Sequence, residues 1–225
     1  MRLLALLPLI LSACVGTAAP PSDRAILAIG DSVMAWNGAR GIPETAGAAL
    51  GRPVVDRAQS GAHLTHPSGA AAALGFDITR QFPGGTWDWV ILTGGGNDLR
   101  GACQTPEEAG ILNGLIGPGL TGDIPTLIAR IRATGAKVAF VGYYDGADAA
   151  RTGFTPCQGA FDTINARMTR LAARDAGLLF FDAGDVIAPS DRSLYARDLI
   201  HPSPAGSAII GRGLADAIRA FEQRS

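Results

Sequence analysis

The chain has 225 residues, of which 47% are hydrophobic and 6% aromatic, a composition typical of a folded globular protein rather than a disordered one. Its 19 basic and 20 acidic residues give a formal net charge of −1, so nothing in the composition indicates a nucleic-acid partner. The length suits one α/β domain with a single hydrophobic core.

The first residues have the pattern of an export signal. Arg2 supplies a positive charge, and the apolar run over 3–11 is too short to span a bilayer. The residues Leu-Ser-Ala-Cys at 11–14 resemble the cleavage site of a bacterial lipoprotein, whose cysteine becomes a lipidated N-terminus. We therefore expect a signal peptide over 1–13, a membrane anchor at Cys14, a tether over 14–23 and a periplasmic or surface-exposed domain over 24–225. The alternative is an ordinary signal peptide with an incidental cysteine.

Two further cysteines, Cys103 and Cys157, lie within the expected domain. An exported chain meets an oxidising compartment, so this pair predicts a disulfide. Cys103 follows the third expected strand and Cys157 follows the fourth, so neighbouring strands would bring the two loops to the same end of a sheet. Two free buried thiols are the alternative.

Strands and helices alternate along the domain. Short apolar runs predict buried strands, and amphipathic stretches ended by glycine predict helices. The expected strands cover 25–29, 53–57, 87–93, 137–143 and 178–182, and the expected helices cover 42–50, 70–81, 125–133, 158–176 and a last segment ending near 221. A further helix is expected to start at Thr105, where Thr-Pro-Glu-Glu has the form of a capping box with proline in the first turn. This alternation predicts a parallel sheet with helices on both faces, a three-layer α/β/α sandwich.

Polar residues with catalytic potential follow three of these strands or precede the last helix. Gly-Asp-Ser at 30–32 follows the first strand, Ser-Gly at 60–61 the second, and Gly-Gly-Asn-Asp at 95–98 the third. Asp198 and His201 stand three residues apart, before the last helix. Since open α/β folds place their chemistry outside the carboxyl ends of the strands, all four segments could face one crevice.

The residue types in these segments suit acyl transfer. A serine hydroxyl such as that of Ser32 needs a base to become a nucleophile, and His201 could be that base if Asp198 fixes its tautomer. The Asn97 amide and the backbone at Gly61 could donate hydrogen bonds to a tetrahedral oxyanion. Taken singly, each motif has a plain structural alternative: a helix-capping serine, a surface Asp and His in a loop, or a flexible glycine turn.

In order and content these four segments resemble the conserved blocks of the SGNH hydrolases, also called GDSL esterases. The resemblance implies that Ser32 is the nucleophile, His201 the base and Asp198 its partner. It also implies an oxyanion hole made by the N–H groups of Ser32 and Gly61 with the Asn97 side chain, and it implies no cofactor. The family has a flavodoxin-like sheet of order 2-1-3-4-5, whose crevice opens between strands one and three. One departure is Ala58, which stands where the family often has asparagine.

Three other short patterns have a chemical interpretation. The Gly-x-Ser-x-Gly elbow of α/β-hydrolases is absent, because Met34 stands where its second glycine would be. The residues over 117–122 have the glycine spacing of a dinucleotide-binding motif. They follow an expected helix rather than a strand and include Pro118, so nucleotide binding is not expected. His63 and His66 could be half of a metal site, yet no cysteine or carboxylate cluster accompanies them. We therefore expect these histidines either to line the substrate cleft or to lie in a loop without a functional role.

These observations predict a serine ester hydrolase that cleaves small-molecule acyl esters through an acyl-enzyme at the bacterial cell envelope. The substrate could be a lipid ester, a thioester or an O-acetylated sugar, and an O-acyltransferase could use the same residues. The alternative from another class is a non-catalytic envelope lipoprotein that uses the fold for binding.

Overall fold

A computed structural model describes residues 24–65 and 69–224 of the chain. The expected signal peptide over 1–13 and the tether over 14–23, with Cys14, lie outside the described residues. His66 lies outside them as well.

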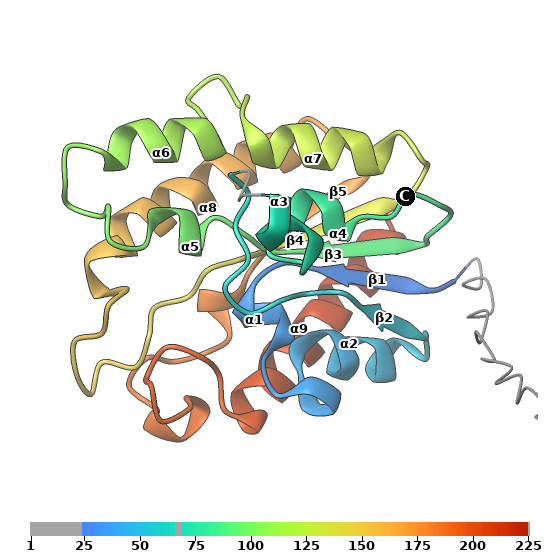
Figure 1. Ribbon diagram of the computed structural model, residues 1–225. Coiled ribbons are helices and arrows are strands. Elements are labelled where there is room, and N and C mark those ends of the chain that lie inside the picture. The colour runs from blue at the N-terminus through green and yellow to red at the C-terminus, as the bar shows by residue number, and fades with distance from the viewer. Residues whose placement is uncertain (1–23, 66–68, 225) are drawn as a thin grey trace, which may run out of the picture.

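The core of the fold is one parallel five-stranded sheet (Figure 1). Its strands are β1 (Ile26–Ile29), β2 (Val54–Asp56), β3 (Trp89–Leu92), β4 (Lys137–Gly142) and β5 (Leu178–Asp182). Their order is β2-β1-β3-β4-β5, which confirms the expected order 2-1-3-4-5. Every residue of β1 and of β3 is buried, as expected for parallel strands covered on both faces.

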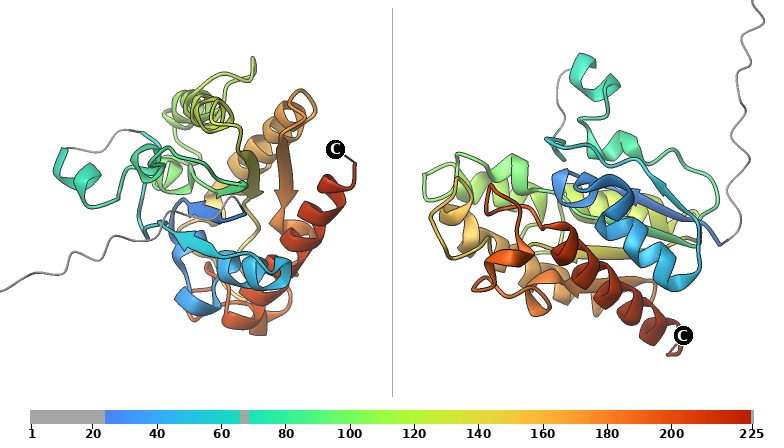
Figure 2. Two further views of the ribbon diagram at one scale, coloured as in Figure 1. Left: turned by 90° about the vertical axis from the view of Figure 1, so that its right-hand side faces the viewer. Right: turned by 90° about the horizontal axis from the view of Figure 1, so that it is seen from below.

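The helices form a layer on each face of this sheet, which confirms the three-layer sandwich. They are α1 (Ser32–Ala35), α2 (Ile42–Leu50), α3 (Gly69–Ala73), α4 (Ile78–Gln81), α5 (Gly96–Leu99), α6 (Glu108–Leu115), α7 (Asp123–Arg132), α8 (Gln158–Ala172) and α9 (Pro204–Glu222). Helices α2 and α9 pack against each other on one face, and α6, α7 and α8 lie on the other (Figures 1 and 2). Among the described residues, no helix is long and apolar enough to cross a bilayer.

The register of the sheet determines where the site forms. Strands β1 and β3 are neighbours, with Ile29 opposite Leu92, so both strands end at the same level. The segments after β1 and after β3 therefore emerge side by side at the carboxyl edge of the sheet. This is the switch point at which open α/β folds bind ligands.

Three helix predictions were wrong in detail. The helix expected over 158–176 ends at Ala172. The expected helix over 70–81 is two short helices, α3 and α4, because the chain between them pairs with His63: the His63 N–H donates to Phe76 O, and the Ile78 N–H donates to His63 O. The helix expected from Thr105 begins only at Glu108. The Thr105 hydroxyl donates to Ala102 O, within a turn, and does not cap the helix.

Candidate active site

The turn after β1 presents Ser32 at the first position of α1. Asp31 caps this helix, because its Oδ1 accepts the Val33 N–H at 3.0 Å. Gly30, just before it, has a φ of 144°, and a Cβ there would lie 2.7 Å from Thr93 O of the segment after β3. Glycine is therefore needed at position 30 both for the backbone conformation and for the close approach of the two segments.

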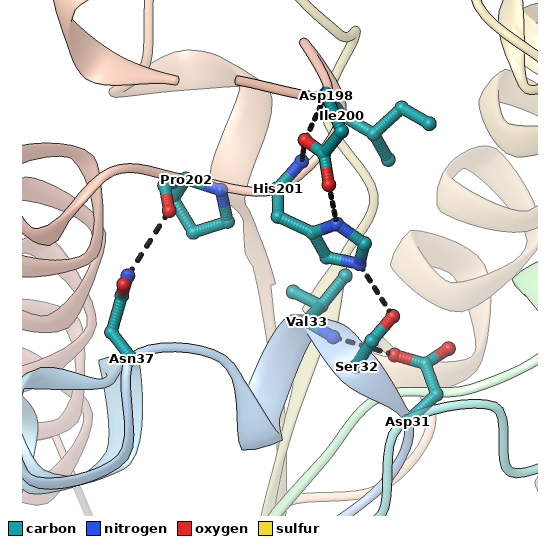
Figure 3. A network of polar contacts seen from close by, with 8 residues as sticks. All are labelled: Asp31, Ser32, Val33, Asn37, Asp198, Ile200, His201 and Pro202. Atoms are coloured by element: carbon teal, nitrogen blue, oxygen red, sulfur yellow. Dashed lines mark hydrogen bonds and ion pairs between the residues drawn. The ribbon is translucent and has the colours of Figure 1, made fainter. Parts of the chain in front are cut away.

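Ser32, His201 and Asp198 form a continuous hydrogen-bonded chain (Figure 3). The His201 Nε2 lies 2.7 Å from the Ser32 Oγ, and its Nδ1 lies 2.6 Å from Asp198 Oδ2. The structure thus brings together three residues from two segments that are 169 positions apart in sequence. This is the arrangement in which an imidazole can take a proton from a serine hydroxyl while a carboxylate fixes its tautomer.

The loop before α9 holds Asp198 in its charged form. Its Oδ1 accepts the N–H groups of Ile200 and His201, both at 3.0 Å. Partial burial tends to raise the pKa of Asp198, but the hydrogen bonds from the His201 ring and from these two N–H groups outweigh it and hold the pKa below its ordinary value. Asp198 is therefore a carboxylate at neutral pH, as a partner that orients a histidine requires.

The expected oxyanion-hole donors Asn97 and Gly61 lie in two turns that contact each other. The Asn97 side chain is held by a hydrogen bond from its Nδ2 to Ala62 O at 2.9 Å, which ties it to the residue after Gly61. Asn97 and Ser32 line the same pocket, and Gly61 is not among the pocket's lining residues. Within the described part of the chain, the N–H groups of Ser32 and Gly61 donate no hydrogen bond, so both could bind a substrate oxygen.

A buried tyrosine connects the serine turn to the asparagine turn. The Tyr143 hydroxyl donates to Asp31 Oδ2 at 2.5 Å and accepts the Gly96 N–H at 2.8 Å. Burial, together with the charge of Asp31, raises the pKa of Tyr143 well above its ordinary value, so the phenol remains protonated and can donate. Burial also raises the pKa of Asp31, although hydrogen bonds from Tyr143 and the Val33 N–H oppose this rise.

Asp98 fixes the loop that carries Gly61 and His63. Its carboxylate accepts the N–H groups of Leu64 and Thr65, at 3.0 and 2.8 Å, and the Thr65 hydroxyl at 2.6 Å. The two turns that provide the expected oxyanion-hole donors are therefore joined twice, once through Asp98 and once through Asn97.

A pocket of about 320 Å³ opens beside these residues. Ser32, Asn97 and His201 lie on its wall, and Tyr143, Phe154 and Phe161 give it an aromatic side. The Tyr143 and Phe161 rings are stacked with centroids 4.6 Å apart. Such a pocket is suited to an apolar or weakly polar group attached to an ester carbonyl.

The expected disulfide between Cys103 and Cys157 is present, and both residues are buried. It joins the segment after α5 to the start of α8, two residues from the pocket wall at Thr155. Because β3 and β4 are neighbours, their loops emerge at one end of the sheet, as the sequence predicts.

The remaining sequence patterns contribute little to this site. His63 does not line the pocket, and among the described residues no cluster of His, Cys, Asp or Glu could hold a metal ion. The glycines over 117–122 lie between α6 and α7, after a helix, where the dinucleotide pattern has no structural basis.

Sequence reasoning missed Tyr143 and Trp36. Tyr143 follows β4 directly, so its place at a strand's carboxyl end was a signal that could have found it. Trp36 contacts His201, and nothing in the sequence pairs these two residues.

The fold is similar to those of several solved esterases. A carbohydrate acetylesterase from Sinorhizobium meliloti is 21% identical, with a TM-score of 0.64, over 88% of this chain and 99% of its own. The aryl esterase of M. smegmatis is 18% identical, with a TM-score of 0.63, over 88% and 99% of the two chains. A carbohydrate esterase family 2 enzyme with a carbohydrate-binding domain from Corynascus thermopiles is 20% identical, with a TM-score of 0.62, over 93% of this chain and 69% of its own. Identities this low establish a shared fold only.

A comparison with curated proteins finds no match. The sequence does match the model of the GDSL-like lipase/acylhydrolase family over residues 28–209, a range that contains Ser32, Asn97, Asp198 and His201. The chain therefore belongs to this family and is a carboxylic ester hydrolase of the SGNH type.

Proposed function

We propose that this chain hydrolyses carboxylic esters through a covalent acyl-enzyme on Ser32. The observation that carries the proposal is the chain of contacts from Ser32 Oγ through the His201 ring to Asp198, which ends at a pocket wall. In this reaction His201 Nε2 takes the hydroxyl proton as Ser32 Oγ bonds to the ester carbonyl carbon. The carbonyl oxygen becomes an oxyanion, which the Asn97 amide and the N–H groups of Ser32 and Gly61 stabilise.

The second half of the reaction reverses these proton movements. The imidazolium of His201 gives its proton to the leaving alkoxide, the carbon–oxygen bond breaks, and the alcohol departs. Water then enters, His201 takes one of its protons, and the hydroxide oxygen attacks the acyl carbon. Collapse of the second oxyanion releases the carboxylic acid and returns the proton to Ser32.

The pocket supports a substrate with a compact acyl or alcohol group. Its volume of about 320 Å³ and its aromatic side at Tyr143, Phe154 and Phe161 favour an apolar group near the carbonyl. Similar folds belong to a carbohydrate acetylesterase and an aryl esterase, so an O-acetylated sugar is a candidate beside a lipid ester or a thioester. Transfer of the acyl group to a second alcohol would make the protein an O-acyltransferase on the same site.

The test is covalent labelling by a fluorophosphonate followed by peptide mass spectrometry. We expect a single adduct on Ser32 in the wild type and none in Ser32→Ala, with Ser60→Ala as the control because Ser60 lies in a neighbouring segment. An unlabelled but folded wild type would exclude the acyl-enzyme and favour the non-catalytic envelope-binding protein. A series of acyl esters and acetylated glycans, each with water or an added alcohol as acceptor, separates the hydrolase from the transferase.

We further propose that the domain is held at the cell envelope by lipid on Cys14. The support is the Leu-Ser-Ala-Cys sequence at 11–14 after a short apolar run. Several acyl chains on one cysteine would anchor the protein firmly, whereas a single chain would not. Intact-mass analysis of the membrane fraction tests this, with Cys14→Ser as the control. A mature chain that begins elsewhere, or carries no lipid, would contradict the proposal.

A further inference from the structure

An indole ring lies flat against the imidazole of His201. The Trp36 and His201 rings have centroids 3.9 Å apart and planes inclined by only 11°. Trp36 directly follows α1, and its N–H donates to Ser32 O, so the same short helix positions both the serine and the indole. Trp36 is not among the residues that line the pocket, so its contact is with the histidine rather than with the space for substrate.

The next residue fixes this stack to the segment that carries His201. Asn37 Nδ2 donates to Pro202 O at 3.0 Å (Figure 3). It also donates to Ser207 Oγ at 2.9 Å. Pro202 directly follows His201, and Ser207 is a fully buried residue of α9. Asn37 itself has a left-handed φ of 68°, a conformation that asparagine tolerates better than most residues. The segment that carries the indole is therefore hydrogen-bonded to the segment that carries the imidazole, which keeps the two rings in contact.

The face of an indole ring attracts cations more strongly than the face of a phenyl ring does. In the proposed mechanism His201 becomes an imidazolium when it takes the Ser32 proton. We propose that Trp36 is a positioning residue that keeps the His201 ring parallel to the indole and stabilises the imidazolium as each tetrahedral intermediate forms. This inference rests on the proposed acyl-enzyme mechanism. A leucine side chain has no π-system and would supply no such attraction.

Other charged groups surround His201, and the test has to keep them constant. Asp198 contacts its Nδ1, and Asp31 interacts with its charge from the turn before α1. Asp145, Asp148 and Arg151 line the same pocket. None of these residues changes in a Trp36 variant, so a changed pH profile reports on the indole itself.

The experiment measures kcat and KM across pH for Trp36→Leu and Trp36→Phe on an acyl ester that the wild type hydrolyses. For Trp36→Leu we expect kcat to fall roughly 3- to 30-fold, the range that cation–π attraction allows. The acidic limb of the kcat profile should move to lower pH by about 0.5 to 1.5 units, because protonated His201 loses its stabilisation. KM should change little, and Trp36→Phe should lie between Trp36→Leu and the wild type.

Trp87→Phe is the matched control. Trp87 lies before β3, at the opposite end of the strands from Ser32. Replacing its indole by a phenyl ring should leave the pH profile of kcat unchanged. Asn37→Gly keeps the left-handed conformation but removes both hydrogen bonds, so kcat should fall with a smaller shift of the acidic limb. If Trp36→Leu does not fold, Asn37→Gly still tests whether the contact between Trp36 and His201 affects kcat and its acidic limb.

Two results would overturn the inference. One is a folded Trp36→Leu variant whose kcat profile keeps its acidic limb at the wild-type pH. The other is a Trp36→Phe variant whose kcat and acidic limb equal those of Trp36→Leu. Either result would mean that the indole only packs against His201 and does not stabilise its charge. Failure of the proposed mechanism looks different, because the wild type itself would then not be labelled at Ser32 by the fluorophosphonate.

Discussion

The hydroxyl of Tyr143 lies 2.5 Å from Oδ2 of Asp31, and it also accepts the Gly96 N–H, so one buried phenol connects the residue before Ser32 to the residue before Asn97. A Cβ at position 96 would lie 2.9 Å from this hydroxyl, so only glycine permits the approach. The distance between nucleophile and oxyanion donor therefore depends on a side chain that follows β4.

Replacing Tyr143 by phenylalanine should impair both stability and turnover. It leaves a buried carboxylate oxygen and a buried N–H without their partner, which costs about 1–3 kcal/mol of unfolding free energy. Because the phenol would no longer tie the turn of Asn97 to the turn of Ser32, kcat should fall about 10-fold or more while KM changes less. Thermal unfolding and steady-state kinetics measure the two effects. Tyr144→Phe is the matched control for stability, because among the described residues the buried Tyr144 hydroxyl has no hydrogen-bond partner and its loss should be nearly neutral in thermal unfolding.

Asp31→Asn should change how stability depends on pH. Because the folded-state pKa of Asp31 is raised, the wild type gains stability from its protonated form at low pH and loses it as pH rises through that pKa. Asparagine does not titrate and caps a helix equally well. The melting temperature of the variant minus that of the wild type should therefore increase from about pH 4 to pH 7. A difference that stays constant over this range would contradict the raised pKa.

The residues of the hydrogen-bonded chain should act as one unit. Ser32→Ala and His201→Ala should each reduce kcat by roughly 10⁴-fold or more, and the double variant should be little worse than either. Asp198→Ala should retain more activity, because the carboxylate only orients the ring and stabilises its charge. Asp216→Ala, which removes a carboxylate from an exposed ion pair on α9, is the control and should keep full activity. Wild-type turnover in folded Ser32→Ala would show that another group is the nucleophile.

Asn97→Ala should reduce kcat by roughly 10²–10³-fold with a smaller change in KM, as expected for a donor that acts on the transition state. Asn97→Asp keeps the size of the side chain but replaces the amide donor by a negative charge, so it should be at least as damaging. Asn113→Ala removes an exposed asparagine whose Oδ1 accepts a hydrogen bond from Arg167, and should have no effect. If Asn97→Ala proves harmless, the oxyanion hole consists of the N–H groups of Ser32 and Gly61.

Loss of the disulfide should mainly affect stability. The bond closes a loop with a sequence separation of 54 residues, and the chain-entropy model assigns such a closure about 4 kcal/mol. Cys103→Ser with Cys157→Ser should thus lower the melting temperature and leave KM close to that of the wild type. Thiol titration of the unreduced Cys14→Ser variant should find no free thiol, and two titratable thiols would contradict the pairing.

The sequence alone determined the order of strands and helices and the residues that could carry the chemistry. Helix α2 and strand β5 match the predicted ranges 42–50 and 178–182, because their apolar periodicity and glycine boundaries are local signals. Ser32, Asn97, Asp198 and His201 could be predicted for a related reason. Each follows a strand or precedes a helix, and topology alone brings such positions to one edge of a parallel sheet.

Only the tertiary structure decided which side chains hold these residues in place. The contacts of Tyr143 with Asp31, of Trp36 with His201 and of Asn37 with Pro202 join segments that are 112, 165 and 165 positions apart. The expected helix over 70–81 is divided for the same kind of reason, since the chain between its two halves pairs with His63. Thr105 fails as a cap for a local reason instead, because its hydroxyl donates to Ala102 O within a turn. Hydrogen bonding and ring stacking act over a few ångströms in space, and a sequence pattern records only neighbours along the chain.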